Sequence, residues 1–174
     1  MIYFNGFCLK DDIKFFKPFI QESEFYVYGF SYGAIKAFLH VKELLENFKR
    51  VDKLVLFSPA FFQTKADKFK LLQLKNFEKN QQRYVDNFID NCFLPYKRCD
   101  IILNNDTKED LEKLLHFEWK IDELYKIKQK GVKIEVYLGG KDRIIDVDGA
   151  MEFFKEVADI TYIKDANHFL KVGE

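Results

Sequence analysis

One pentapeptide restricts the fold of this chain more than any other segment: Gly29-Phe30-Ser31-Tyr32-Gly33. The residues before it, Phe25-Tyr26-Val27-Tyr28, are typical of a buried strand, and those after it carry apolar side chains at helical spacing. A strand that turns directly into a helix over a serine leaves no room for side chains two residues to either side. The pentapeptide therefore predicts a strand–turn–helix unit that exposes the Ser31 hydroxyl at a helix N-terminus, where the backbone potential is positive.

Short β-type runs alternate with helical patterns along the chain, which favours a parallel sheet built from β-α-β units. The expected strands are Ile2–Phe4, Glu24–Gly29, Lys53–Ser58, Val132–Leu138 and Asp159–Ile163. A helix is expected from about Tyr32 to Phe48, between the second and third strands. The sequence thus predicts an α/β fold with about five strands.

The connection between the third and fourth strands is much longer than one crossover helix requires. Its helical patterns cover Lys68–Phe77, Gln82–Asn91 and Lys108–Lys130, and Asp106 or Thr107 is a candidate cap for the last of these. We therefore expect one domain over residues 1–174, with a core of residues 1–59 and 131–174 and a helical lid inserted at about 60–130.

Composition excludes several classes of protein. Hydrophobic residues make up 48% of the chain and aromatic residues 17%, which excludes intrinsic disorder. The 28 basic and 28 acidic side chains balance, so bulk charge does not favour nucleic acid. No apolar run is long enough to cross a membrane, and the N-terminus lacks a signal-peptide pattern. We expect a soluble cytoplasmic protein that binds neither nucleic acid nor a membrane.

The three cysteines, Cys8, Cys92 and Cys99, do not have the spacing of a metal site or a disulfide framework. They are expected to be reduced and packed, and no metal site is predicted.

A serine hydroxyl is a poor nucleophile without a base. His40 falls within the predicted helix after the pentapeptide, and His116 lies in the helical insertion. His168 follows the last predicted strand, in a loop at the same sheet edge as Ser31. We therefore predict His168 as the base.

The base requires an orienting acid, and Asp142 ends a glycine-rich turn directly after a predicted strand. Asp146 and Asp148 are alternatives, although Asp146 is better placed to cap the following helix. Asp165 lies too close to His168 on the same loop to be preferred. The predicted order along the chain is serine, acid, base.

An oxyanion requires two backbone N–H donors aimed at one point. The Tyr32 N–H, next to the serine, is one candidate. The other is the Phe7 N–H, because Gly6 allows the chain to turn back towards the pentapeptide after the first strand.

These segments resemble motifs of the α/β-hydrolase superfamily. Gly29–Gly33 resembles the nucleophile elbow, Gly139–Asp142 the acid turn and Asn167-His168 the base loop. Phe4-Asn5-Gly6-Phe7 resembles the oxyanion turn, with Asn5 in place of the usual histidine. The resemblance implies a serine hydrolase that needs no metal or organic cofactor.

The stretch between Gly6 and Ser31 is too short for the additional strand and helix of a full-length member, so we expect a truncated α/β-hydrolase fold. The pattern resembles the short bacterial pimeloyl-acyl-carrier-protein methyl ester esterases of biotin synthesis. The segments that carry this resemblance are Gly29-Phe30-Ser31, Leu56-Phe57-Ser58-Pro59 and Gly131-Val132-Lys133-Ile134-Glu135-Val136. It implies hydrolysis of a methyl ester on a carrier-bound acyl chain, with release of methanol.

Two other functions remain open. The same three residues serve a different carboxylesterase or thioesterase equally well, because they determine acyl transfer and not the acyl group. A truncated hydrolase fold is also compatible with a non-catalytic binding protein, although retention of serine, acid and base argues against that function.

The insertion is basic between residues 60 and 98, with eight Lys or Arg against four Asp or Glu. One interpretation is a solvated lid. The other is a docking surface for an acidic acyl-carrier protein, represented by Lys65, Lys68 and Arg83. In that case the phenylalanines of the insertion are expected to line the acyl path: Phe61, Phe62, Phe69 and Phe77.

Truncation also leaves one face of the sheet without its usual helices, and parallel sheets are normally covered on both faces. A helix over Lys10–Ile20 is the expected cover, since Phe15, Phe16 and Phe19 give it an apolar side. A second subunit is the alternative. We accordingly predict a monomer, with a dimer as the competing arrangement.

Overall fold

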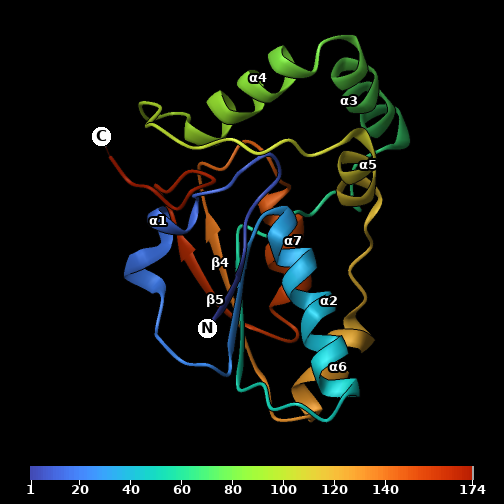
Figure 1. The fold of residues 1–174 in the computed structure, drawn as a ribbon, viewed down its shortest axis with the longest axis vertical. Helices are drawn as coiled ribbons and strands as arrows, with labels where there is room; N and C mark the ends of the chain where they lie inside the picture. The colour runs from blue at the N-terminus through green and yellow to red at the C-terminus, as the bar shows by residue number, and fades with distance from the viewer. Residues whose placement is uncertain (174) are drawn as a thin grey trace.

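Five parallel strands follow one another across a single sheet in chain order. The computed structural model describes residues 1–173 (Figure 1). The strands are β1 (Ile2–Phe4), β2 (Tyr26–Phe30), β3 (Lys53–Phe57), β4 (Lys133–Gly139) and β5 (Asp159–Ile163). The predicted fold class and all five predicted strands are confirmed, with small shifts at strand ends.

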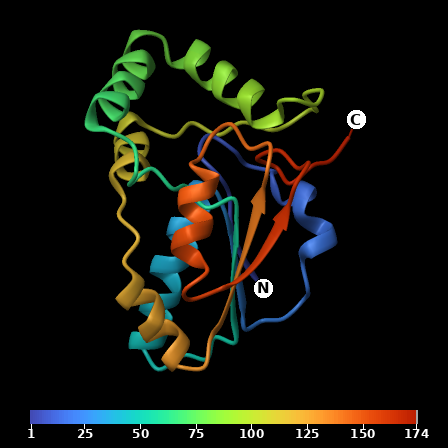
Figure 2. The ribbon, with the colours of Figure 1, turned by 180° about the vertical axis from the view of Figure 1, so that it is seen from behind.

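Three helices cover one face of the sheet (Figure 2): α2 (Tyr32–Glu46), α6 (Ile121–Gln129) and α7 (Val147–Phe154). The alternating pattern of β4 determines which side they cover, because Ile134, Val136 and Leu138 are buried beneath these helices. The crossovers after β2, β3 and β4 thus place their sheet-packing helices on the same side, as the strand order requires.

The other face is covered by the short helix α1 (Ile13–Phe16) and the 3₁₀ turn η1 (Lys17–Phe19). Phe16 is fully buried there and stacks on Phe57, with ring centroids 4.5 Å apart. Phe19 contacts Tyr137 at 5.1 Å. The predicted helix over Lys10–Ile20 is therefore shorter than expected, because Pro18 has no backbone N–H to continue it. Phe16 and Phe19 nevertheless provide the expected cover, whereas Phe15 packs against Phe93 and Phe169 instead.

The remainder of this face carries charged side chains of β3, β4 and β5 that form ion pairs with one another. Lys53 lies 3.0 Å from Glu135, across from the neighbouring strand. Lys133 lies 2.9 Å from Glu135 and 3.1 Å from Asp159. The face is thus divided into an aromatic part beneath α1 and a polar part near the N-terminal ends of the strands.

The lid lies across the C-terminal ends of the strands and contains α3 (Asp67–Lys79), α4 (Gln81–Phe93) and α5 (Lys108–His116). Thr107 caps α5, with its hydroxyl accepting from the Asp110 amide and the Asp110 carboxylate accepting in return. Of the two predicted caps, Thr107 is therefore the one used.

The single helix predicted over Lys108–Lys130 is wrong, because Trp119 interrupts it. The indole Nε1 of Trp119 donates to the Ala60 carbonyl at 2.9 Å, and its ring packs against Phe38 and Phe154. Burying that ring forces an extended segment between α5 and α6. Because α6 then lies beside α2 on the sheet, the lid ends before residue 130.

No helix within residues 1–173 has the length and apolar character needed to cross a bilayer.

Replacing Phe16 with alanine tests the role of α1 as a cover. We expect Phe16→Ala to lower the free energy of unfolding by about 3–5 kcal/mol, because a fully buried ring is lost from between α1 and the sheet. Phe48→Ala is the matched control, since Phe48 is 97% exposed, and its effect should stay within about 0.5 kcal/mol. Urea denaturation measures both, and equal stabilities for the two variants would contradict this assignment.

Candidate active site

Ser31 occupies the tight turn between β2 and α2, with φ of 53° and ψ of −115°. The flanking glycines are required by the backbone around them. A Cβ on Gly29 would overlap the Gly33 carbonyl, and a Cβ on Gly33 would overlap the carbonyls of Phe4 and Asn5. The predicted strand–turn–helix unit is therefore present, and the left-handed backbone at a non-glycine residue shows that the turn is strained.

The backbone of Ser31 is held on both sides while its side chain is left free. Its amide donates to the Phe57 carbonyl at 2.9 Å, and its carbonyl accepts from the amides of Ala34 and Ala60. Although Ser31 is the N-cap residue of α2, its hydroxyl makes no capping hydrogen bond. Serine at this position commonly uses its side chain as a cap, so the free hydroxyl here is available for chemistry.

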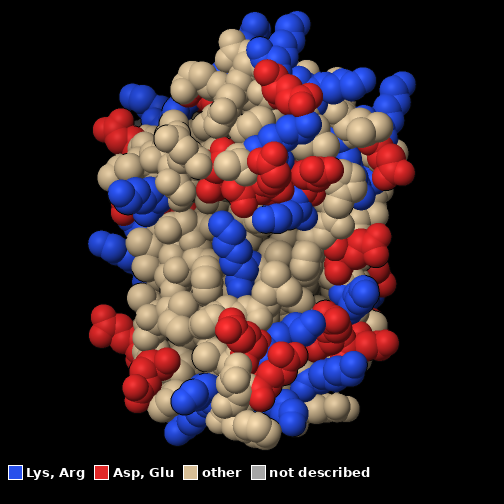
Figure 3. All heavy atoms as spheres, turned by 45° about the vertical axis from the view of Figure 1, so that its right-hand side comes forward, with Lys and Arg blue, Asp and Glu red and all other residues tan. Residues whose placement is uncertain are grey.

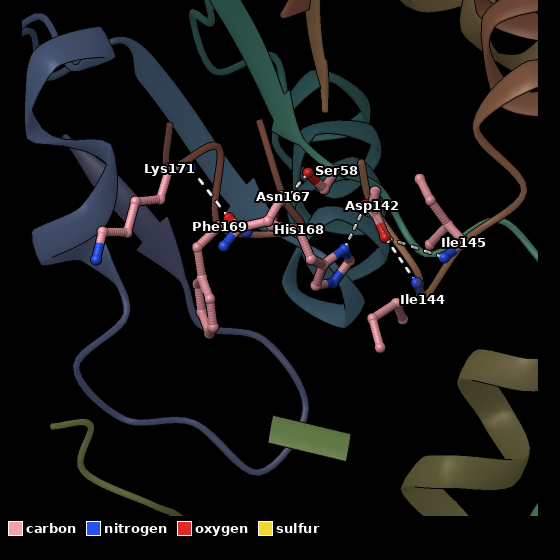
Figure 4. A network of polar contacts seen from close by, with 8 residues as sticks. All are labelled: Ser58, Asp142, Ile144, Ile145, Asn167, His168, Phe169 and Lys171. Atoms are coloured by element: carbon pink, nitrogen blue, oxygen red, sulfur yellow. Dashed lines mark hydrogen bonds and ion pairs between the residues drawn. The ribbon is translucent and has the colours of Figure 1, made fainter. Parts of the chain in front are cut away.

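The two remaining predicted catalytic residues lie together at the same edge of the sheet (Figure 4). His168 Nδ1 and Asp142 Oδ2 are 2.6 Å apart, and both side chains are fully buried. The other carboxylate oxygen of Asp142 accepts from the backbone amides of Ile144 and Ile145, at 2.7 and 3.3 Å. An ionised Asp142 accepts at every one of these contacts, so Nδ1 carries the imidazole proton and Nε2 is left as the basic nitrogen.

Within residues 1–173, His168 Nε2 is buried and has no hydrogen-bond partner. The imidazole packs against Phe30, the residue before Ser31, with ring centroids 4.8 Å apart. A buried polar atom without a partner is uncommon and calls for an explanation. A basic nitrogen held open beside the serine turn is the arrangement that a general base requires.

The base loop is fixed by two side chains that sequence reasoning did not assign to the site. The hydroxyl of Ser58 donates to the His168 carbonyl at 2.8 Å. Asn167 donates to the Phe93 carbonyl at 2.8 Å, and its oxygen accepts from the amides of Phe169 and Lys171. Both lie within segments that carried the family resemblance, but their hydrogen-bonding roles depend on long-range contacts that the sequence does not reveal.

The competing histidines have other contacts. His40 packs edge-on against Phe4 at 5.5 Å and lies 3.7 Å from Glu43. His116, at the end of α5, faces the Glu112 carbonyl at 3.1 Å. Neither contacts the Asp142–His168 pair.

The competing acids are likewise occupied. Asp146 accepts from the Gly149 amide at 3.1 Å as the cap of α7, and from the Thr64 hydroxyl at 2.6 Å. These hydrogen bonds lower the pKa of Asp146. Asp165 pairs with Lys141 at 3.0 Å.

No group of three or more His, Cys, Asp or Glu side chains suited to a metal ion occurs among residues 1–173.

The two predicted oxyanion donors are unoccupied. Within the described residues, neither the Phe7 amide nor the Tyr32 amide has a hydrogen-bond acceptor. The end of β1 lies against the first turn of α2, where Gly33 has no side chain. The rings of Phe7 and Tyr32 are 6.5 Å apart at their centroids. The two free amides therefore belong to segments in direct contact.

Ser31 opens into a cavity of about 690 Å³ between the sheet edge and the lid. Its apolar lining includes Phe7, Phe88 and three leucines of α5. Its polar lining comprises Lys79, Arg83, Arg143, Gln73, Asn76, Asn80, Asn87 and Asn91. No Asp or Glu among the described residues contributes to this lining, so the cavity is suited to a substrate with an apolar part and an anionic part.

Of the four phenylalanines predicted to line an acyl path, Phe62 and Phe69 line the cavity. Phe61 instead packs against Phe153 and Phe154, and Phe77 packs against Phe7. The prediction is wrong for these two because their side chains hold the lid to the core.

The predicted basic positions lie on the lid, from which Lys and Arg side chains project at the top of Figure 3. Arg83 lines the cavity mouth from α4, whereas Lys65 and Lys68 lie near the start of α3, outside the cavity lining. Of the three positions, Arg83 therefore reaches the cavity and the two lysines do not.

Solved structures similar to this one are α/β-hydrolases. An esterase from Exiguobacterium antarcticum matches with a TM-score of 0.62 and 16% identity, over 82% of this chain and 59% of that protein. A bromoperoxidase from Bacillus anthracis matches with a TM-score of 0.64 and 14% identity, over 83% and 60%. BioG from Haemophilus influenzae matches with a TM-score of 0.56 and 10% identity, over 97% and 87%.

These similarities establish the α/β-hydrolase fold for this chain. The chain spans less than two thirds of the Exiguobacterium esterase and of the Bacillus bromoperoxidase. No protein-family model matches the sequence, and no curated protein matches it either.

Exchange of single carboxylates tests the assignment of the acid. We expect Asp142→Asn to lower kcat on a soluble ester about 10⁴-fold, because the neutral amide no longer favours the required imidazole tautomer. Asp146→Asn removes a carboxylate four residues away that caps a helix, so its kcat should stay within about twofold of the parent value. Steady-state kinetics on both variants, with circular dichroism as a folding check, decide between them. Full activity in Asp142→Asn would transfer the role to another acid.

Proposed function

We propose that this chain is a serine esterase that hydrolyses the methyl ester of pimeloyl-acyl-carrier protein. One observation supports the esterase chemistry above all others. Among residues 1–173, the buried Asp142–His168 pair leaves one basic nitrogen without a partner beside the Ser31 turn. That arrangement is the one a hydroxyl nucleophile requires, and it recurs in unrelated hydrolases.

In the acylation step, His168 Nε2 takes the proton of the Ser31 hydroxyl as the oxygen attacks the ester carbonyl. Asp142 stabilises the imidazolium that forms. The carbonyl oxygen becomes an oxyanion and accepts from the Phe7 and Tyr32 amides. The tetrahedral intermediate then collapses, the bond to the methoxy oxygen breaks, and His168 returns its proton so that methanol leaves.

In the deacylation step, a water molecule gives a proton to His168 and attacks the acyl-serine. Collapse of the second intermediate breaks the bond to Ser31, which regains its proton from His168. The product is a free carboxylate on the acyl chain. Neither step calls on a metal or an organic cofactor.

The cavity supports a carrier-bound substrate. Lys79, Arg83 and Arg143 line it together with several amide side chains and no carboxylate among the described residues. The arm that links an acyl chain to a carrier protein contains a phosphodiester, which these cations attract. The apolar lining near Ser31 suits the methylene chain of the acyl group.

The similarity to BioG, which extends over 97% of this chain, agrees with this substrate class. At 10% identity, this similarity does not identify individual functional residues. We propose a role in biotin synthesis in the cytoplasm as part of the same function. Similar structures also include a carboxylesterase and a naproxen esterase, both from Bacillus subtilis, and they favour a general carboxylesterase as the second candidate.

Methyl-pimeloyl carrier protein tests the proposal directly. We expect the parent protein to release methanol from it, and Ser31→Ala to lower turnover about 10⁴–10⁶-fold with the fold retained. Ser23→Ala is the matched control, because Ser23 is a half-buried serine outside the cavity lining, and its hydroxyl accepts from the Phe25 amide. Methanol release and the gel mobility of the carrier protein report the reaction.

Two other outcomes contradict the proposal in different ways. A parent protein that hydrolyses soluble esters but leaves the carrier-bound methyl ester intact is a general carboxylesterase. A parent protein that hydrolyses neither kind of ester and does not label with a fluorophosphonate at Ser31 is not a serine hydrolase.

The basic lid positions provide a separate test of the carrier protein as partner. Reversing Lys65, Lys68 and Arg83 to glutamate should raise KM for the carrier-bound substrate at least tenfold and leave kcat/KM for a small neutral ester within about threefold. The effect should shrink as salt is raised, since the Debye length is about 8 Å at physiological ionic strength.

The matched control reverses Lys126, Lys128 and Lys130, three exposed lysines at the far end of the molecule from the lid. This variant carries the same change in net charge and should behave like the parent protein. Equal losses on both substrates in the lid variant would indicate a damaged lid instead of a lost docking surface.

A further inference from the structure

Asp12 is a fully buried carboxylate outside the serine, acid and base. Its Oδ2 accepts from the Gly6 amide at 2.6 Å, and its Oδ1 accepts from the Tyr3 hydroxyl at 2.8 Å. With the Asn5 amide oriented to match its neighbours, Asn5 Nδ2 also donates to Asp12 Oδ1 at 2.8 Å. All three donors come from β1 and the turn that follows it.

Helix capping does not explain this carboxylate. Asp12 stands at the N-cap position of α1, yet its side chain makes no capping hydrogen bond. Burying a charged group is costly, and the cost is accepted only where specific hydrogen bonds hold the charge. Burial raises the pKa of Asp12 to about 6, and the hydrogen bonds from Gly6 and Tyr3 oppose that rise. The hydrogen bonds from Gly6 and Tyr3 thus favour the charged carboxylate at a place where burial disfavours it.

A second buried carboxylate holds the other side of the same turn. Asp106, in the lid segment between α4 and α5, accepts from the Cys8 amide at 2.6 Å through Oδ2. Cys8 has a positive φ of 56°, so this amide sits in a strained backbone conformation. The pairing of Leu9 with Leu103 in an antiparallel bridge brings the two segments side by side.

Phe7 lies between the two restrained amides. Its own amide has no acceptor within the described residues, and its buried ring packs against Tyr32, Phe77 and Phe88. We propose that Asp12 and Asp106 are positioning residues that hold the Gly6 and Cys8 amides, and thereby fix the Phe7 N–H for the oxyanion. This inference rests on the proposed esterase function of Ser31.

The physical reason is preorganisation. A short turn containing glycine can rotate its peptide planes, and a rotated plane would direct the Phe7 N–H away from the reacting carbonyl. An oxyanion donor contributes only if it is already aimed when charge develops, and loss of one donor typically costs about 10²–10³ in kcat. Charge-assisted hydrogen bonds on both neighbouring amides oppose that rotation.

Asp12→Ala tests the inference, with Asp11→Ala as the matched control. Asp11 is the adjacent carboxylate and pairs with Lys14 at 3.0 Å instead of contacting the turn. On a soluble p-nitrophenyl ester we expect Asp12→Ala to lower kcat about 100-fold with KM changed less than threefold, and Asp11→Ala to match the parent protein. Asp12→Asn, which keeps one acceptor oxygen, should recover part of the rate and covers the case in which the alanine variant fails to fold.

A second readout separates positioning from general damage. Replacing the carbonyl oxygen of the ester by sulfur weakens the hydrogen bonds of an oxyanion hole, so the parent protein should prefer the oxoester over the thionoester. We expect that preference to fall about tenfold in Asp12→Ala and to be unchanged in Asp11→Ala. An unchanged preference and an unchanged kcat in Asp12→Ala would overturn the inference.

Asp106→Ala tests the other side of the turn, with Asp100→Ala as control, because Asp100 is exposed. We expect the same loss of kcat and of oxoester preference in Asp106→Ala, and parental values in Asp100→Ala. Parental values in Asp106→Ala would remove Asp106 from the inference.

Failure of the proposed function gives a different result. In that case the parent protein neither hydrolyses esters nor labels with a fluorophosphonate, and amide hydrogen exchange decides the inference. Exchange at Gly6 should be at least tenfold faster in Asp12→Ala than in Asp11→Ala. Equal exchange at Gly6 in the two variants would overturn the role of Asp12 whatever the protein catalyses.

Discussion

The absence of a side chain at Gly33 is the constraint on which the rest of the site depends. It lets the first turn of α2 approach the carbonyls of Phe4 and Asn5 more closely than any other residue allows. That approach places the end of β1 beside the serine turn, so the amides of Phe7 and Tyr32 belong to touching segments. Gly29 and Gly139 act in the same way, because a Cβ on Gly139 would overlap the carbonyls of the base loop. Close backbone approach at three strand ends thus concentrates the reactive groups along one edge of the sheet.

The sheet and the nucleophile could be predicted from the sequence because they rest on local patterns. Alternation in β4 and the flanking glycines of Ser31 are signals that extend over a few residues. The parts that could not be predicted depend on long-range contacts. Trp119 breaks a helix that its periodicity favours, because its indole bonds to Ala60 far away along the chain. Asp12 has no signal in the sequence: it stands at the N-cap position of α1, yet its carboxylate accepts from the Gly6 amide instead of capping the helix.

The lid and the base loop are joined by a hydrogen bond and by an aromatic contact. The Asn167 side-chain amide donates to the carbonyl of Phe93, the last residue of α4. Its oxygen accepts from the backbone amides of Phe169 and Lys171, which follow His168. The Phe93 ring also packs on Phe169 at 4.6 Å. Movement of α4 that opens the cavity would therefore strain the loop that carries the base. A lid coupled in this way favours access through side-chain rearrangement at the cavity mouth, where Arg83 and Arg143 lie, over rigid opening of the whole lid.

The short segment from Asp12 to Phe19 links the stability of the truncated sheet to the geometry of its site. Phe16 and Phe19 cover the face opposite α2, α6 and α7, and their contacts with Phe57 and Tyr137 hold α1 and η1 on the sheet. The start of α1 determines where the Asp12 carboxylate lies, and that carboxylate holds the Gly6 amide. A longer hydrolase can cover its sheet and shape its oxyanion turn with separate elements. Here one segment does both, so a substitution that loosens the aromatic cover also loosens the turn, and the two properties cannot be optimised independently.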